Sequence, residues 1–85
     1  MYYVYILQDR HGKIYIGYSA DLKKRLQDHL KGRSCYLRNK RPVKLIYYEA
    51  YLSRKDARAR EKSLKNYGSV LAGLKLRIKN SFMIS

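Results

Sequence analysis

Five side chains along this sequence have types that could share one chemical task. They are Tyr5, Tyr15, Arg25, His29 and Glu61. A phenol or an imidazole can act as a general base, a guanidinium can offset charge that develops on a phosphate, and a carboxylate can hold a divalent cation. If the fold brings the five together, they form a site for metal-assisted cleavage of a phosphodiester bond.

The two tyrosines fall in segments that predict a β-hairpin. Residues 2–8 and 14–18 are rich in β-branched and aromatic side chains, and the turn-forming stretch 9–12 separates them. Because side chains alternate between the faces of a strand, Tyr5 and Tyr15 share a face only if the loop has three or five residues. The alternative interpretation is that both tyrosines simply pack in the sheet.

Arg25 and His29 belong to a segment with a helical pattern. Ser19 or Asp21 can cap a helix that runs to about Lys31. At about 100° per residue, Arg25 and His29 lie one turn apart at the edge of the apolar stripe, so we expect them to point toward the rim of the sheet. The alternatives are an arginine that extends along apolar surface to water and a hydrogen-bonded core histidine.

Glu61 lies in a second predicted helix. This helix starts at a capping-box-like pair, Ser53 and Asp56, and ends near Tyr67. The helical period places Glu61 in the middle of the apolar stripe that contains Ala57. A lone carboxylate is costly to bury, so Glu61 must meet a cation, which is either a metal ion or a Lys or Arg side chain.

The remaining segments complete the expected fold. Residues 33–42 form a basic loop, residues 43–50 a third strand, and a last helix has an apolar stripe of Leu71, Leu74 and Ile78. The order ββαβαα predicts an α+β fold, a small three-stranded, mostly antiparallel sheet covered by helices. A chain of 85 residues predicts one domain that spans its whole length.

The charge balance predicts a polyanionic partner. Lys and Arg number 20 and Asp and Glu number 6, a net charge of +14. No apolar run approaches the roughly 20 residues of a membrane-spanning helix, which favours nucleic acid over a membrane. We expect phosphate contacts from the basic loop, although a solvated run of charges explains the same pattern. The loop residues concerned are Arg33, Arg38, Lys40 and Arg41.

Aromatic content supports an alternative function. The chain has ten tyrosines, one phenylalanine and no tryptophan. Tyrosines can stack on bases, so a noncatalytic basic nucleic-acid-binding module is the competing hypothesis.

Cysteine usage bears on the compartment. The single cysteine, Cys35, cannot form an internal disulfide, and residues 1–4 lack the features of a signal peptide. We therefore expect a reducing cytoplasm. One cysteine and two histidines also exclude the usual four-ligand structural zinc site.

At these residues the sequence resembles the GIY-YIG nuclease family, particularly its small stand-alone bacterial members, which are similar to an excinuclease catalytic domain. Residues 3–5 match the first motif, residues 15–17 the second, and residues 57–65 the helix that bears the family's glutamate. The resemblance spans roughly residues 2–78. Tyr-Val replaces the Gly-Ile of the first motif, but its functional tyrosine is retained as Tyr5.

The resemblance implies a metal-dependent endonuclease that hydrolyses DNA, structure-selective and acting in repair or recombination, with RNA as an alternative substrate and a partner protein as one source of specificity. It implies that Glu61 holds one divalent cation, Mg²⁺ or Mn²⁺, and that Arg25 offsets charge on the pentacovalent phosphate. Tyr5 or Tyr15 would orient or deprotonate the attacking water, with His29 assisting or sharing that role. A phenol has a pKa near 10, so a tyrosine base needs a nearby cation.

Two further positions enter with the motifs. Gly17 can let the backbone or the substrate approach closely beneath Tyr15, or it is merely a glycine at a strand end. Some members of the family have an additional active-site asparagine, for which Asn66 is a weak match.

Overall fold

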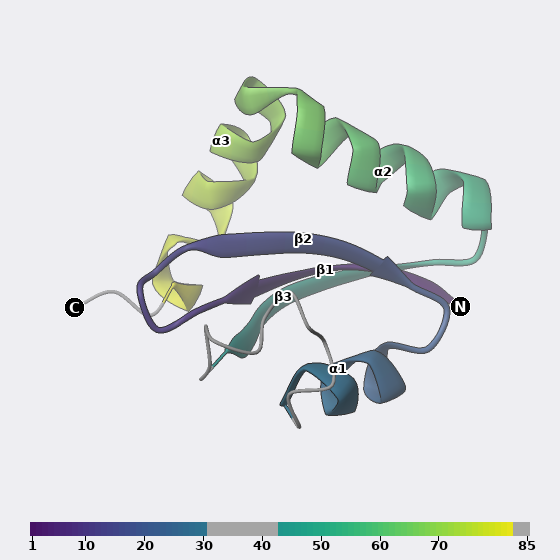
Figure 1. The fold of residues 1–85 in the computed structure, drawn as a ribbon. Helices are drawn as coiled ribbons and strands as arrows, with labels where there is room; N and C mark the ends of the chain where they lie inside the picture. Colours follow the sequence, from purple (N-terminus) through teal and green to yellow (C-terminus); the bar gives the residue numbers. More distant parts are fainter. Residues whose placement is uncertain (31–42, 83–85) are drawn as a thin grey trace.

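The computed structural model describes residues 1–30 and 43–82, except for the side chains of His29 and Leu30. The predicted order ββαβαα is confirmed (Figure 1). The strands are β1 (Tyr2–Gln8), β2 (Ile14–Ser19) and β3 (Lys44–Tyr51). The helices are α1 (Leu22–Leu30), α2 (Arg54–Asn66) and α3 (Gly68–Arg77), followed by the short 3-10 helix η2 (Lys79–Ser81).

β1 is the central strand of a three-stranded sheet. The strand order is β2-β1-β3, and β1 is antiparallel to both neighbours. Four consecutive residues of β1, Val4 to Leu7, are buried because the strand is covered on both faces. This explains why β1 reads as an unbroken apolar run with no polar alternation. The predicted antiparallel α+β sheet is confirmed, and the strand order is new information.

The hairpin between β1 and β2 has the geometry that places its tyrosines on one face. Tyr5 pairs with Gly17 and Leu7 pairs with Tyr15. Gln8 pairs with Ile14, which leaves the five residues 9–13 as the loop, one of the two predicted lengths. Gly12 in this loop has a φ of 86°, a left-handed conformation that favours glycine.

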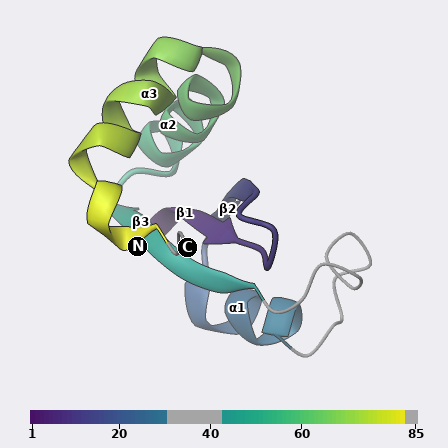
Figure 2. The same ribbon diagram turned by 90° about the vertical axis from the view of Figure 1, so that its left-hand side faces the viewer.

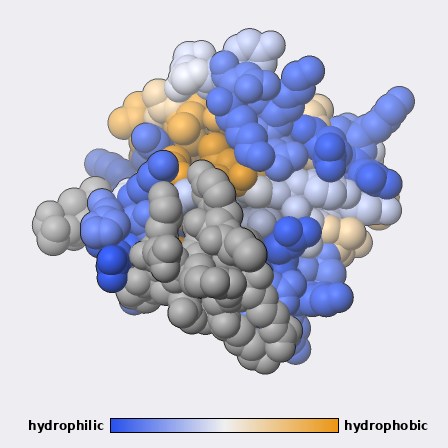
Figure 3. Space-filling model, in the orientation of Figure 1, coloured by the Kyte–Doolittle hydropathy of each residue, from blue (hydrophilic) through white to orange (hydrophobic). Residues whose placement is uncertain are grey.

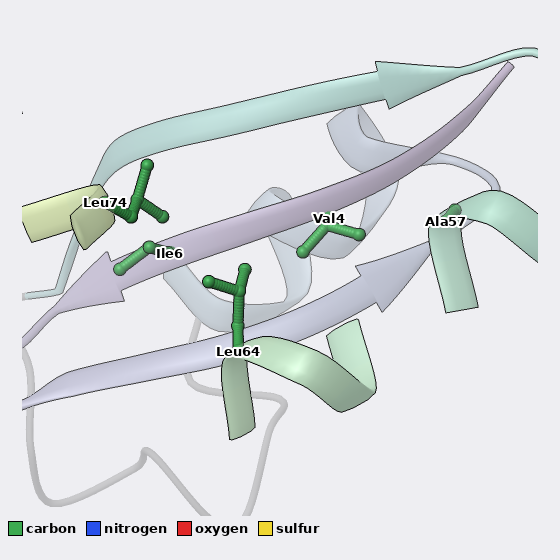
Figure 4. Packing of buried hydrophobic residues seen from close by; sticks show 5 residues of the cluster. All are labelled: Val4, Ile6, Ala57, Leu64 and Leu74. Carbon is green, nitrogen blue, oxygen red and sulfur yellow. The ribbon is translucent and has the colours of Figure 1, made fainter. Parts of the chain in front are cut away.

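Helices cover both faces of the sheet. α1 lies against one face, and α2 and α3 lie against the other (Figures 1 and 2). On the α2 face, Val4 and Ile6 of β1 point toward side chains of α2 and α3 (Figure 4). The helical members of this cluster are Ala57, Leu64 and Leu74. On the α1 face, a second cluster packs Tyr5 and Leu7 against leucines of α1.

Polar side chains set the starts of both helices that carry candidate site residues. The Asp21 Oδ1 atom accepts a hydrogen bond from the Lys24 amide at 3.1 Å, so Asp21 caps α1. The Ser53 Oγ atom accepts one from the Asp56 amide at 3.4 Å and caps α2. Both caps agree with the sequence pattern. Among the described helices, none combines the length and apolarity needed to cross a membrane.

Candidate active site

Tyr5 and Gly17 are in close contact at the candidate site. They are direct partners on β1 and β2, and the Tyr5 ring lies across the Gly17 Cα. A Cβ on residue 17 would overlap the Tyr5 Cζ and Oη atoms and would lie 2.8 Å from Cε1. Gly17 therefore makes room for the Tyr5 phenol to extend over the edge strand β2. The sequence interpretation allowed a close approach at Gly17 but associated it with Tyr15.

The Tyr5 phenol interacts electrostatically with a cation and an anion from helices on opposite faces of the sheet. Burial raises the pKa of Tyr5, the nearby Arg25 guanidinium lowers it, and the nearby Glu61 carboxylate raises it, with a net increase above 10. Arg25 belongs to α1 and Glu61 to α2. Three of the five predicted residues therefore lie close enough to interact electrostatically.

Arg25 is exposed, whereas the helical pattern predicted that it would be turned away from bulk water. Its guanidinium still acts on Tyr5. A side chain that is exposed and yet beside a buried phenol is accessible to a phosphate group from solution.

Glu61 occupies the border between the buried and the exposed faces of α2. Its side chain is 17% exposed, and its Oε2 atom lies 3.1 Å from the Lys65 Nζ atom. Ala57 on the same helix is buried, as the apolar stripe predicted, and so is Leu64. A lysine partner, the alternative left open by the sequence, is therefore present.

A metal site at Glu61 would contain a single protein carboxylate. Among residues 1–28 and 43–82, no group of three or more His, Cys, Asp or Glu side chains is arranged to hold a metal ion. Mg²⁺ commonly keeps several waters and binds through one or two carboxylates together with substrate phosphates. One half-buried carboxylate at the edge of a prospective phosphate site fits that mode of binding.

Tyr15 is directed to the hairpin loop. Its hydroxyl donates a hydrogen bond to the Asp9 Oδ2 atom at 2.9 Å. The Asp9 Oδ1 atom accepts hydrogen bonds from the amides of His11 and Lys13 at 2.8 and 3.0 Å. Burial raises the pKa of Asp9, but the hydrogen bonds from Tyr15 and the two amides outweigh it and lower the pKa overall. Asp9 was not among the predicted site residues, and the sequence signal for it is an aspartate at the start of a tight loop.

A second polar cluster, also not predicted, joins β3 to α2. Glu49 accepts hydrogen bonds from the hydroxyls of Tyr47 and Tyr51 and from the guanidinium of Arg60. The distance from Tyr47 Oη to Glu49 Oε2 is 2.6 Å, and that from Arg60 Nε to Glu49 Oε1 is 3.0 Å. Alternation along β3 places the two tyrosines and the glutamate on one face, a pattern readable as Tyr-x-Glu-x-Tyr. Arg60 is thereby fixed to β3, one residue before Glu61.

Several predicted site residues lie wholly or partly outside the described part of the chain. The backbone of His29 belongs to α1, but its side chain lies outside the described residues. The four cations predicted to contact phosphates, Arg33, Arg38, Lys40 and Arg41, also lie outside them. Asn66, by contrast, is the last residue of α2 and is exposed.

One class of domain combines this strand order and antiparallel hairpin with a site of the kind formed by Tyr5, Arg25 and Glu61. Residues 1–69 match the model of the GIY-YIG catalytic domain, and the chain belongs to this family. Membership places it in a nuclease superfamily.

The chain is similar to small bacterial proteins that share the name UPF0213. It is 42% identical over 64 residues to a UPF0213 protein of Streptococcus pneumoniae, a match that covers 74% of this chain and 65% of that protein. A UPF0213 protein of Bacillus pumilus is 37% identical over 67 residues, 78% of this chain and 68% of that protein. The chain therefore spans slightly less than two thirds of the length of the first of these relatives.

A solved structure has the same fold. The solution NMR structure of the UPF0213 protein BH0048 from Bacillus halodurans is 32% identical to this chain and superposes with a TM-score of 0.55. The match covers 88% of this chain and 86% of the other.

Proposed function

We propose that the chain is an endonuclease that hydrolyses phosphodiester bonds of DNA with the help of a divalent cation, Mg²⁺ or Mn²⁺. In this proposal the enzyme prefers particular DNA structures, acts in repair or recombination, and obtains further specificity from a partner protein. The observation that carries the proposal is that the Tyr5 phenol, which lies against Gly17, is close enough to Arg25 and Glu61 to interact electrostatically with both.

These three residues offer complementary groups to a phosphate. Arg25 would donate hydrogen bonds to the phosphate oxygens and offset the charge that grows on them. Because burial raises the pKa of Tyr5, its phenol is protonated at neutral pH in the metal-free protein and would orient the attacking water by hydrogen bonding. Glu61 would hold the cation, which would stabilise charge on the phosphate as a Lewis acid.

Tyr15 and Asp9 provide a route for a proton. The Tyr15 hydroxyl donates to Asp9, which is a carboxylate at neutral pH because its pKa is lowered. If the phenol oxygen accepts a proton from the attacking water, its own proton can pass to the Asp9 carboxylate. In this proposal Asp9 therefore acts through Tyr15, and His29 retains the assisting role implied by the family resemblance.

The ion pair between Glu61 and Lys65 supports a second candidate, a noncatalytic nucleic-acid-binding module. A glutamate neutralised by lysine needs no metal ion. However, the Lys65 side chain is 49% exposed, and an i,i+4 pair of this kind contributes only about 0.3–0.5 kcal/mol. A bound divalent cation can displace so weak a partner, so we favour the nuclease.

A cleavage screen tests the proposal. Duplex, flap, branched and single-stranded DNA, with RNA in parallel, are incubated with the protein and Mg²⁺ or Mn²⁺, and with EDTA as the metal-free arm. We expect cleavage that EDTA abolishes and that Glu61→Gln reduces by at least about 100-fold. The matched control is Asp56→Asn, which removes a carboxylate from the exposed first turn of the same helix and should retain activity.

The outcomes separate the two candidates. Cleavage that survives Glu61→Gln unchanged would contradict the assignment of Glu61 and with it the nuclease site described above. Tight, salt-dependent binding without cleavage of any substrate would instead support the binding module.

A further inference from the structure

The exposed flank of α2 that borders Glu61 is strongly basic. Its cations are Arg54, Arg58, Lys62 and Lys65, and all four residues are exposed. At about 100° per residue they fall within about 80° of one another around the helix axis, and Arg54 lies about 20° from Glu61. We call these four residues the basic flank.

Two contacts show which way the basic flank faces. On one side of α2, Arg60 binds Glu49 of β3. On the other side, the Arg58 guanidinium lies over the Tyr18 ring of β2, 5.0 Å from its centroid. Since β2 and β3 are the two edges of the sheet, the basic flank faces the β2 edge. This is the edge where the Tyr5 phenol crosses Gly17.

The basic flank has little compensating negative charge. Within the described part of the chain, Arg54 and Lys62 have no carboxylate partner, and Lys65 alone of the four is paired, with Glu61. Like charges at i,i+4 spacing, as in Arg54, Arg58 and Lys62, destabilise a helix. In the orientation of Figure 1, hydrophilic side chains gather over α2 on this side of the molecule (Figure 3). Because these like charges destabilise α2, their presence is explained if the basic flank binds an external anion.

The spacing of the basic flank fits a phosphate backbone. From Arg54 to Lys65 the helix rises about 16 Å, with successive cations about 4–6 Å apart. One strand of a duplex places a phosphate every ~3.4 Å along its axis, so four cations can accompany about four or five phosphates.

We propose that the basic flank of α2 binds the phosphate backbone of a nucleic acid and guides one strand along the β2 edge to Tyr5, Arg25 and Glu61. This site rests on the proposed function only in taking nucleic acid as the ligand. It differs from the loop at residues 33–42 predicted from sequence, because it is built on a helix anchored to both edges of the sheet. Two cations of the flank, Arg54 and Lys62, would contact phosphates without touching the reacting atoms.

A charge-matched pair of double variants tests this site. The test variant is Arg54→Gln with Lys62→Gln, and the control is Lys75→Gln with Lys79→Gln, which removes two exposed cations from α3 and η2. Binding of a fluorescent 20-base-pair duplex is measured by anisotropy in EDTA, over about 50–200 mM salt. Thermal melting of each variant checks that it is folded.

The expected results are quantitative. Each lost phosphate contact reduces the slope of log K against log salt by about 0.9, so the test variant should lose about 1.8 in slope and at least tenfold in affinity at 100 mM salt. The control should change affinity by less than about twofold, because diffuse charge is screened. Equal losses in the two variants, or no loss in the test variant, would overturn the proposal.

Two further arms distinguish nucleic acid from lipid as the ligand, and binding from catalysis. Binding to vesicles of anionic lipid is measured with the same variants. If vesicle binding requires Arg54 and Lys62 but DNA binding does not, the proposal is also overturned. With Mg²⁺ present, the test variant should lower kcat/KM, chiefly by raising KM. The binding assay contains no metal, so a wild-type protein that binds through the basic flank but cuts nothing would contradict the proposed nuclease and leave the site supported.

Discussion

The Tyr5 ring occupies the space that a side chain on Gly17 would need, and this contact sets the direction of the phenol. Tyr5 is 5% exposed, so its ring has little freedom to move aside. We expect Gly17→Ala to displace the ring from its position near Arg25 and Glu61. A displacement of about 1 Å at a reacting centre can reduce catalysis by 100-fold, and overpacking costs about 1–3 kcal/mol of stability.

The measurement for Gly17→Ala is the rate of metal-dependent DNA cleavage together with the free energy of unfolding. Gly73→Ala is the matched control, because a Cβ at Gly73 in α3 meets no atom within 4 Å. The control should retain activity and gain about 0.5–1 kcal/mol in stability through lower backbone entropy of the unfolded chain. Full activity in Gly17→Ala would show that the orientation of Tyr5 is not needed.

Arg25 should control the ionisation of Tyr5. Its guanidinium lowers the pKa of the phenol, against burial and Glu61, which raise it. In Arg25→Gln the pKa of Tyr5 should rise further, and activity at neutral pH should fall by about 100-fold through the loss of charge stabilisation. The pH-rate profile measures this effect: any limb that depends on the Tyr5 phenolate should move to higher pH in Arg25→Gln and move less in Arg25→Lys.

The neighbouring variant Lys24→Gln is the control for Arg25, since it removes an exposed positive charge from the same helix. A similar shift of the pH-rate profile in both variants would indicate general charge loss and would contradict a specific role for Arg25.

Much of this arrangement could be predicted from sequence. Strand alternation and a five-residue loop place Tyr5 and Tyr15 on one face. The helical period places Glu61 within the apolar stripe, and the structure finds its side chain 17% exposed at the border of that stripe. The directions of the two hydroxyls could not be predicted. Periodicity assigns a side chain to a face, whereas the hydroxyl of Tyr15 is directed by its partner Asp9, and the ring of Tyr5 by the space above Gly17.

The strand order and the pairing of Arg60 with Glu49 also could not be predicted from the sequence pattern. A strand buried on both faces, such as β1, has the same apolar composition whichever neighbours it has. Arg60 resembles any other cation in a helix with several of them, and its pairing with Glu49 depends on how α2 is placed against β3. Long-range placement, which no local pattern encodes, determines both features.

Tyr15 and Asp9 should act as one unit. Tyr15→Phe removes the hydroxyl, and Asp9→Asn removes the charge that receives its proton but keeps an oxygen that can accept hydrogen bonds from the loop amides. Each should reduce cleavage by about 100-fold, and the double variant should be no worse than either single variant. Rates of the three variants, with thermal melting to monitor the hairpin, check this expectation. Additive losses would indicate that the two residues act separately.

Glu49 should stabilise the fold in a pH-dependent way. Burial raises the pKa of Glu49, but the hydrogen bonds from Arg60, Tyr47 and Tyr51 outweigh burial. The net effect is a pKa below the usual 4.5. A carboxylate with a lowered pKa contributes stability above its unfolded pKa and loses that contribution as the pH falls through the folded pKa. We expect Glu49→Gln to cost about 2 kcal/mol at neutral pH.

Denaturant unfolding from neutral pH to about pH 3 measures the contribution of Glu49. The difference in stability between wild type and Glu49→Gln should shrink below about pH 5, since the variant cannot titrate. A difference that stays constant across this range would contradict the role assigned to the ionised carboxylate.

The two tyrosines that bind Glu49 should make the stability of the fold depend on pH in the opposite sense at high pH. Burial and the hydrogen bonds to Glu49 raise the pKa of Tyr47 and of Tyr51 from 10.0 to about 12. Between these values the folded protein binds more protons than the unfolded chain, so stability falls as the pH rises. The double variant Tyr47→Phe with Tyr51→Phe should be less stable than wild type below pH 10, by about 1 kcal/mol for each lost hydrogen bond. Its stability should then fall less steeply toward pH 12, as measured by thermal melting, and identical slopes for the two proteins would contradict the coupling to Glu49.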